Sequence, residues 1–224
     1  MTSEPGSWSA EPVEKKEEPT MKTLVTEGTP WQELYRRLVE VVVPRPIALV
    51  STVDPEGRPN LAPFSFFTVV SANPPYLAFS PLRSGRTGEI KDTLRNITAT
   101  GQFVVHVVTE ALAEAVNKTA ASLPPGASEF EAAHLTPVPS QRVRPPRVKE
   151  SPVALECELV EVRAYGEAGG AGNLVVGRIL AVHMDEAVLD EEGRVAPERL
   201  KAVGRMGSEA WVTTEGTFVL TRPD

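Results

Sequence analysis

The sequence predicts a mainly β protein, an antiparallel barrel with helical insertions, and three observations support this fold class. Short apolar runs rich in β-branched residues, which are typical of strands, recur along the chain. Turn-forming residues separate several of them, as in DPEG at 54–57 and GEAGGAG at 166–172. Strands and helices do not alternate regularly, which disfavours a parallel doubly wound sheet. An antiparallel barrel fits this pattern best.

A single domain preceded by a tail is expected. Residues 1–22 are rich in Pro, Glu, Lys and Ser, so we expect a disordered acidic tail there and one domain over 23–224. The net charge of −7 gives no reason to expect binding to nucleic acid or to an anionic membrane. No apolar run reaches membrane-spanning length and no hydrophobic signal region begins the chain, which predicts a soluble cytoplasmic protein.

The first expected element is a helix over 29–42, TPWQELYRRLVEVV. Thr29 is a candidate cap and Pro30 suits the first helical position. Pro44 and Pro46 should end the helix, because proline cannot continue it. One face of this helix should be apolar and would carry Leu34, Leu38 and Val41.

The remaining elements are mainly strands. Two helices are expected between them, at 89–97 and 110–120, and a proline-rich excursion covers 123–147. The expected strands are 47–53, 58–67, 76–80, 102–108, 152–165, 173–185 and, closing the chain, 217–223.

Residues for metal or nucleophilic chemistry are few. The only cysteine, Cys157, lies in an apolar run and should be a buried, inert thiol. The three histidines, His106, His134 and His183, are isolated, so a metal site is not expected. His106 and His183 lie in predicted strands, where a hydrogen-bonded interior histidine is the usual case, although His183 could also face a substrate. The glycines at 166–172 precede a strand, which predicts a hairpin connection and not a dinucleotide-binding loop.

The segment SPLRSGRTGEIKDTLRNI at 80–97 has the composition of a phosphate site. A loop that carries Ser80, Arg83 and Arg86 leads into a helix start, where backbone N–H groups and cations can bind an anion. Lys91 and Thr93 are close enough in sequence to contact the same group. A solvated basic loop explains the same residues equally well.

The stretch NLAPFSFFTVVSANPP at 60–75 could line a flat ligand. Pro63 lacks an N–H, so a central, fully paired strand is disfavoured, and an edge strand leaves backbone groups free for a ligand. Asn60 and Ser65 add polar contacts, and the phenylalanines add apolar walls that suit a heteroaromatic ring. An ordinary core strand is the alternative.

Together these segments resemble a known family. PRPIALVSTVDPEGRPNLAPFSFFTVVSANPP at 44–75, followed by KDTLRNI at 91–97, is similar to the flavin reductase-like proteins with an FMN-binding split β-barrel. That family includes flavoredoxin and the reductase components of two-component monooxygenases. The similarity continues through AVNKTAASLPPGASEFEAAHL at 115–135, RVKESPVALECEL at 147–159 and the final RPD at 222–224.

The resemblance implies an antiparallel split β-barrel that forms a homodimer and binds FMN, or alternatively FAD, near the subunit interface. Ser51 and Thr52 would approach the flavin from the strand next to NLAPFSFF. The residues placed beside the isoalloxazine ring are Asn60, Leu61, Ala62, Pro63, Phe64, Ser65, Phe66 and Phe67. Those placed around the ribityl phosphate are Ser80, Arg86, Lys91, Asp92 and Thr93.

The function implied is that of an NAD(P)H:FMN oxidoreductase, which passes hydride from a reduced nicotinamide nucleotide to flavin. Electrons would then reach free flavin or a redox partner such as a monooxygenase. The flavin supplies the chemistry, so no acid or base side chain is required. One alternative is a flavoredoxin-like electron carrier that does not oxidise NAD(P)H, and another is a barrel that has lost its cofactor. Near the C-terminus, relatives often have an R-x-G-G sequence followed by tyrosine, whereas this chain has Ser208 and Trp211, so no substrate-facing role is carried over to that region.

Overall fold

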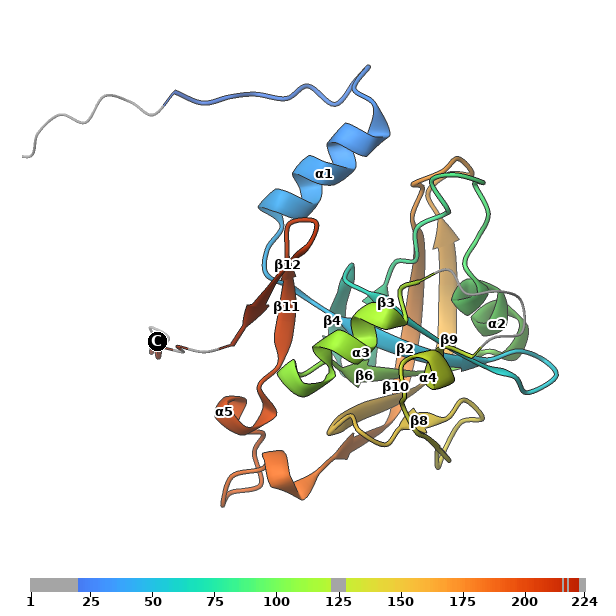
Figure 1. The fold of residues 1–224 in the computed structure, drawn as a ribbon, viewed down its shortest axis with the longest axis vertical. Coiled ribbons are helices and arrows are strands. Elements are labelled where there is room, and N and C mark those ends of the chain that lie inside the picture. The colour runs from blue at the N-terminus through green and yellow to red at the C-terminus, as the bar shows by residue number, and fades with distance from the viewer. Residues whose placement is uncertain (1–19, 122–127, 215, 217, 222–224) are drawn as a thin grey trace, which may run out of the picture.

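The computed structural model describes residues 20–121, 128–214, 216 and 218–221. The expected tail therefore lies outside the described residues, apart from 20–22. Antiparallel sheets dominate the described chain, and helices are inserted between the strands, as the sequence predicted (Figure 1). Among the described residues, no helix has the length and apolar character that crossing a bilayer requires.

The largest sheet has seven antiparallel strands in the order β3-β2-β6-β9-β10-β5-β4. Pro63 lies in β3, at an edge, which confirms the position that its missing N–H predicted. The strand bounds are β2 Ala48–Val53, β3 Pro59–Phe64, β4 Phe67–Ala72, β5 Pro75–Phe79, β6 Gln102–Val107, β9 Val153–Ala164 and β10 Asn173–Met184.

The two edges of this sheet are close in space because they are close in sequence. β3 ends at Phe64 and β4 begins at Phe67, a step that an extended chain spans in at most about 11 Å. A flat sheet of this order would separate its edges by about 29 Å, given about 4.8 Å between neighbouring strands. The sheet must therefore curl until β3 and β4 approach each other without pairing, which is the arrangement expected of a split barrel.

Smaller elements surround this sheet. A second antiparallel sheet has the order β1-β11-β12, and β7 pairs with β8. These strands are β1 Arg45–Pro46, β7 Pro137–Val138, β8 Arg147–Val148, β11 Val203–Met206 and β12 Ala210–Thr213. The α-helices are α1 Trp31–Val41, α2 Asp92–Thr100, α3 Ala113–Lys118, α4 Glu129–Ala132 and α5 Pro197–Leu200, with 3₁₀ turns at Glu110–Leu112 and Glu186–Val188.

Helices cover both faces of β2, and every residue of this strand is buried as a result. Alternate side chains point to opposite faces of a sheet. Leu49 packs in a core cluster with Val116 of α3 and Phe130 of α4, whereas Val50 packs in a second cluster with Leu94 of α2. The near-continuous apolar sequence of this strand follows from its two covered faces.

Helix α1 forms where it was expected, but the predicted assignment of its first residues was wrong. Pro30 occupies the N-cap position, and the Thr29 hydroxyl donates to the Val25 carbonyl at 2.6 Å instead of capping the helix. The predicted apolar face is largely uncovered: Leu38 is 54% and Val41 72% exposed. Figure 1 shows the reason, because α1 projects away from the large sheet toward the side of β11 and β12.

Other boundaries also differ from the prediction. The strand expected over 58–67 divides at residues 65 and 66, because the chain there passes from one sheet edge to the other. The helix expected from residue 89 begins at Asp92, after a turn that contains Gly88 at a φ of 72°. The expected closing strand was wrong, since residues 218–221 form no strand, and the short strands β11 and β12 were missed.

Candidate functional site

A buried cluster of amide and hydroxyl groups joins β2, β3 and α2. The Asn60 amide donates to Thr93 Oγ1 at 3.0 Å and to Thr52 Oγ1 at 3.4 Å. The Asn96 amide donates to the same Thr52 hydroxyl at 3.0 Å. These contacts attach the first turn of α2 to the edge strand β3. Asn96 was not predicted in this role, and its helical spacing from Thr93 was the one local signal that could have indicated it.

The residues predicted to contact flavin lie on two faces of the sheet. Asn60 and Thr52 face α2, whereas Ser51 and Leu61 are register partners on the opposite face and are both 0% exposed. Leu61 packs with α3 and α4, so its side chain belongs to the core. The half-buried residues of the stretch are Ala62, Pro63, Phe64, Ser65, Phe66 and Phe67.

The loop before α2 is fixed to the hairpin that joins β9 and β10. The Arg83 N–H donates to Ala171 O at 2.9 Å, and the Gly170 N–H donates to Arg83 O at 3.1 Å. The Arg83 side chain turns into its own loop, where NH1 donates to Gly88 O at 3.1 Å. The Arg83 Nε is buried without a hydrogen-bond partner in the described part of the chain.

A cavity of about 460 Å³, here called the Trp31 cavity, opens between this loop and α1. Arg83, Ser84 and Lys91 line it beside the start of α2. None of the ion pairs within the described ranges includes Arg83 or Lys91. Two cations and a hydroxyl beside a helix start form a donor set that suits a phosphate.

The other residues predicted around the phosphate lie at different places. Arg86 is exposed at the tip of the loop, and the Asp92 carboxylate pairs with Arg95 along the outside of α2. Ser80 is half-buried after β5, and its N–H donates to Phe66 O at 2.9 Å. The structure therefore brings Lys91 and Thr93 to the helix start together with Arg83, while the side chains of Arg86 and Asp92 point elsewhere.

The Trp31 indole forms one wall of the cavity and covers two glycines. A Cβ atom at Gly170 would lie 2.5 Å from the indole, and one at Gly85 would lie 2.9 Å from it. Gly170 also has a φ of +84°. Glycine is therefore required at this position both by the backbone conformation and by the close approach of the indole. Helix α1 had been predicted as a helix only, and its contribution of Trp31 and Tyr35 to this site was missed.

A second cavity, of about 180 Å³ and here called the arginine cavity, continues from the first. Tyr35 lines both cavities, and its ring lies 6.4 Å from that of Phe66. The arginine cavity is bounded chiefly by Arg45, Phe64, Ser65, Asn117, Arg205 and Trp211. The Trp31 cavity thus lies beside the loop before α2, and the arginine cavity lies beside residues 63–65 of the predicted flavin segment.

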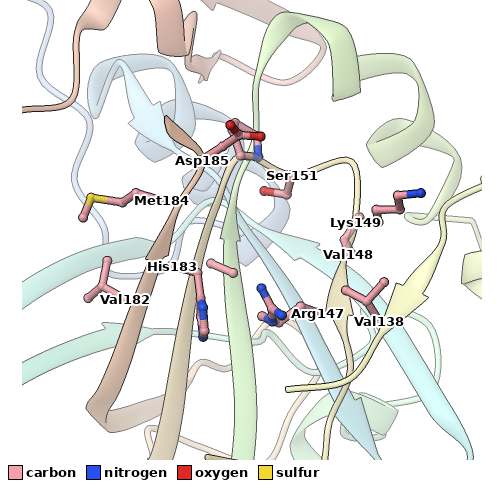
Figure 2. Close-up of a pocket in the computed structure, with 11 residues that line it drawn as sticks. Val138, Arg147, Val148, Lys149, Ser151, Val182, His183, Met184 and Asp185 are labelled. Carbon is pink, nitrogen blue, oxygen red and sulfur yellow. The ribbon is translucent and has the colours of Figure 1, made fainter. Parts of the chain in front are cut away.

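A third cavity, of about 500 Å³, lies between β8 and the end of β10, apart from the predicted site (Figure 2). Figure 2 shows His183 and Arg147 on its lining. The His183 Nε2 lies 2.7 Å from Glu156 Oε1, so this histidine has an interior carboxylate partner, as an ordinary structural histidine would. The Gln141 and Arg142 N–H groups also donate to Glu156, and these bonds together lower the pKa of that carboxyl against the opposing effect of its burial.

The two remaining expectations of buried, inert side chains are confirmed. His106 is 0% exposed, and its Nε2 accepts the Val148 N–H at 2.9 Å, so Nδ1 donates to Leu49 O. Burial lowers the pKa of His106 to about 4, which keeps the ring neutral. Burial likewise raises the pKa of the Cys157 thiol far above its usual range.

Comparison with known proteins agrees with this arrangement. The model of the flavin reductase like domain matches residues 41–200. The uncharacterized protein YwrF of Bacillus subtilis is 40% identical over 195 residues, which cover 86% of this chain and 94% of that protein. The crystal structure of nitrilotriacetate monooxygenase component B from Bacillus cereus is 37% identical, with a TM-score of 0.84 over 90% of this chain and 99% of that one.

Another solved structure is the 2-nitrobenzoate 2-nitroreductase NbaA of Pseudomonas fluorescens. It is 31% identical to this chain, with a TM-score of 0.80, and the likeness covers 90% of this chain and 96% of that one. The matched domain spans most of the described sheet, including the strand edge, the loop and the helix start described above. This chain belongs to the family of proteins with a flavin reductase like domain.

Proposed function

We propose that the protein is an NAD(P)H:FMN oxidoreductase, that is, a flavin reductase. The observation that carries the proposal is the position of Arg83 and Lys91, which lack acidic partners among the described residues and lie at the start of α2. The segment that follows Asn60 on β3 contains both apolar and polar residues, and it lies next to this helix start. This arrangement suits a molecule with a phosphate at one end and a flat ring at the other.

Each part of the site has a defined task in this proposal. Lys91, Arg83 and the first N–H groups of α2 hold the phosphate. The bond from Asn60 to Thr93 fixes the helix start relative to β3, so that the phosphate end and the ring end keep a constant separation. Tyr35, which also lines the Trp31 cavity, and Phe66, whose ring lies 6.4 Å from that of Tyr35, supply apolar walls for the ring. Bound FMN would itself accept hydride from a nicotinamide nucleotide, so the chain needs only to position both molecules and limit access by water.

We also propose a homodimer and a redox partner. Exposed apolar side chains occur on α1 and on the edge strand β4, where Val69 is 60% and Val70 53% exposed. Apolar surface of this kind is commonly covered by association. The Bacillus cereus relative is named as a component of a monooxygenase, which supports a partner of that class for the electrons of the flavin.

The proposal is tested by the visible absorption spectrum of the purified protein under anaerobic conditions, before and after NADH or NADPH is added. We expect a flavin spectrum that bleaches at once with one of the two nucleotides, and we expect added FMN to bind more tightly than FAD. A protein that binds neither flavin would contradict the proposal. A flavin spectrum that remains oxidised with both nucleotides but bleaches with dithionite would instead identify an electron carrier of the flavoredoxin type.

A further inference from the structure

We propose that the arginine cavity is a subsite for the carboxylate of a small organic acid, bound by Arg205 in the positive field of Arg45. The inference rests on the proposed function in one respect, because it places this acid beside the segment that would contact the flavin. Binding of the acid can be measured without the flavin, so the two proposals can fail separately.

The first support is uncompensated positive charge. Arg45 and Arg205 line the same cavity, and no ion pair among residues 20–121 and 128–214 includes either guanidinium. Burial lowers the pKa of Arg45, and the charge of Arg205 lowers it further, although Tyr35 opposes this effect. An anion placed between the two guanidiniums would relieve their repulsion.

The second support is the set of unused donors. Arg45 already bonds to protein: its NH1 donates to the Val39 and Val42 carbonyls, its NH2 donates to Gly207 O at 2.9 Å, and its Nε contacts Ser65 Oγ at 3.4 Å. Arg45 therefore has a structural task and contributes mainly charge. Arg205, by contrast, donates through NH2 to Ser208 O, and its buried Nε has no partner in the described part of the chain.

The third support is the shape and polarity of the walls. The Arg205 guanidinium lies 5.1 Å from the centre of the Trp211 ring, which holds it in place over the indole. Phe64 forms another apolar wall, and Ser65 and Asn117 add polar groups. A volume of about 180 Å³ is well below the range of about 300–1,000 Å³ typical of drug-sized ligands, so a nucleotide is too large for this cavity. A small planar acid is the class of ligand that fits both the charge and the walls.

The position of the cavity gives the acid a defined relationship to the flavin segment. Pro63, Phe64 and Ser65 line the cavity and belong to the stretch proposed to run along the isoalloxazine ring. Ser208 and Trp211, the residues that depart from the usual R-x-G-G and tyrosine pattern, lie on the same cavity. These two residues therefore help to shape the walls of the subsite in this chain.

The test is calorimetric titration of the full-length protein with benzoate, benzamide and inorganic phosphate, each with and without FMN. We expect benzoate to bind once per chain and benzamide to bind at least about tenfold more weakly, since a neutral amide forms weaker hydrogen bonds with a guanidinium than a carboxylate does. Arg205→Gln should weaken benzoate binding by a similar factor, and Arg205→Lys, which keeps the charge but not the planar fork, should give an intermediate value.

Arg163→Gln is the matched control, because Arg163 also lies over an aromatic ring, 5.4 Å from the centre of Tyr165, but does not line the cavity. This variant should bind benzoate as the unmodified protein does. Any one of three results would overturn the inference. Benzoate could bind the Arg205→Gln variant as tightly as the unmodified protein, benzamide could bind the unmodified protein as tightly as benzoate, or phosphate could bind it more tightly than benzoate. The inference would also be overturned by a lack of benzoate binding together with a change of oligomeric state in Arg205→Gln, because a second copy of the chain would then fill the cavity.

The same titrations separate this inference from the proposed function. Benzoate binding without any FMN binding would leave the subsite intact and contradict the flavin reductase proposal. FMN binding without benzoate binding would overturn the subsite alone, provided that the Arg205→Gln variant keeps its thermal unfolding midpoint.

Discussion

Asn60 and Thr93 are 33 residues apart in sequence, yet the Asn60 amide donates to the Thr93 hydroxyl at 3.0 Å. This bond connects the edge strand of the large sheet to the first turn of α2. It therefore joins the segment proposed to line the flavin ring to the segment proposed to bind its phosphate.

Lys91→Ala combined with Thr93→Ala should weaken FMN binding by at least about tenfold, because it removes a cation and a hydroxyl from the helix start. The affinity can be measured from the quenching of flavin fluorescence. Lys118→Ala, at the exposed end of α3, removes a lysine away from this site and should have no effect. Unchanged affinity in the double variant would remove Lys91 and Thr93 from the phosphate site.

Gly170→Ala should displace the Trp31 indole, since the new Cβ would lie 2.5 Å from it. We expect a shift of tryptophan emission, weaker FMN binding, and a loss of at least about 1–2 kcal/mol in unfolding free energy from the positive φ alone. Gly101→Ala is the matched control, because Gly101 has a φ of +72° and no atom within 4 Å of a Cβ. The control should lose stability without changing the tryptophan emission, and identical emission in both variants would contradict the packing described.

His106 should make the protein less stable in mild acid. Its pKa is about 4 in the folded protein and 6.5 ordinarily, so the unfolded chain takes up a proton that the folded chain does not. The unfolding free energy should therefore decrease as the pH falls from about 6.5 toward 4, by about 3 kcal/mol in total from this group.

Urea unfolding at several pH values measures this dependence. His106→Gln can donate to Leu49 O and accept from the Val148 N–H, as the histidine does, but it does not titrate. The unfolding free energy should change less steeply with pH in this variant, because one group fewer takes up a proton on unfolding. An unchanged slope would show that His106 is not the group that titrates.

Glu156→Gln should destabilise the fold by about 2–3 kcal/mol, because a 0% exposed carboxylate that accepts several N–H donors is replaced by a neutral amide. Glu158→Gln provides the comparison, since Glu158 lies two residues along β9 and makes a 3.5 Å pair with Arg178 near the surface. That exposed pair should contribute less than about 1 kcal/mol. Equal losses from the two substitutions, measured by chemical unfolding, would argue against an organising role for Glu156.

Leu38→Glu with Val41→Glu should weaken the proposed homodimer by at least about 100-fold, if α1 lies in its interface, because two buried apolar side chains contribute at least about 3 kcal/mol. Sedimentation equilibrium measures the change. Glu40→Lys also changes the charge of α1 by two units, but Glu40 is not three or four residues from Leu38 or Val41 and so lies off their face, and this variant should leave the assembly unchanged. A dimer that persists in the double variant would exclude this face from the interface.

Much of the fold could be predicted from local sequence. Apolar runs and turn residues correctly indicated β2, β5, β6, β9 and β10, and the missing N–H of Pro63 correctly indicated an edge strand. The strands β11 and β12 were missed because each is only 4 residues long and because β11 also pairs with β1, which is far away in the sequence. The cap of α1 was wrong because the Thr29 hydroxyl found another acceptor, the Val25 carbonyl.

The candidate site could be predicted only in part. Lys91, Thr93 and Asn60 were indicated by their segments, and the structure places all three around one helix start. The role of Trp31 depends on its contacts with glycines that are distant in sequence, and the role of Arg205 depends on its packing over the Trp211 ring. A local sequence pattern does not contain this information.

Sequence by itself thus determined the types of the main elements and the chemical character of the loop proposed to bind phosphate, because periodicity, turn residues and donor groups act over short distances. Tertiary structure alone decided which face of the sheet each side chain joins: Asn60 meets α2, while its neighbour Leu61 enters the core. It also decided that Arg45 and Arg205 line one cavity without an acidic partner in the described chain. The second contact arises because Arg45 of β1 and Arg205 of β11 are register partners in the smaller sheet, which pairs two strands that are distant in sequence.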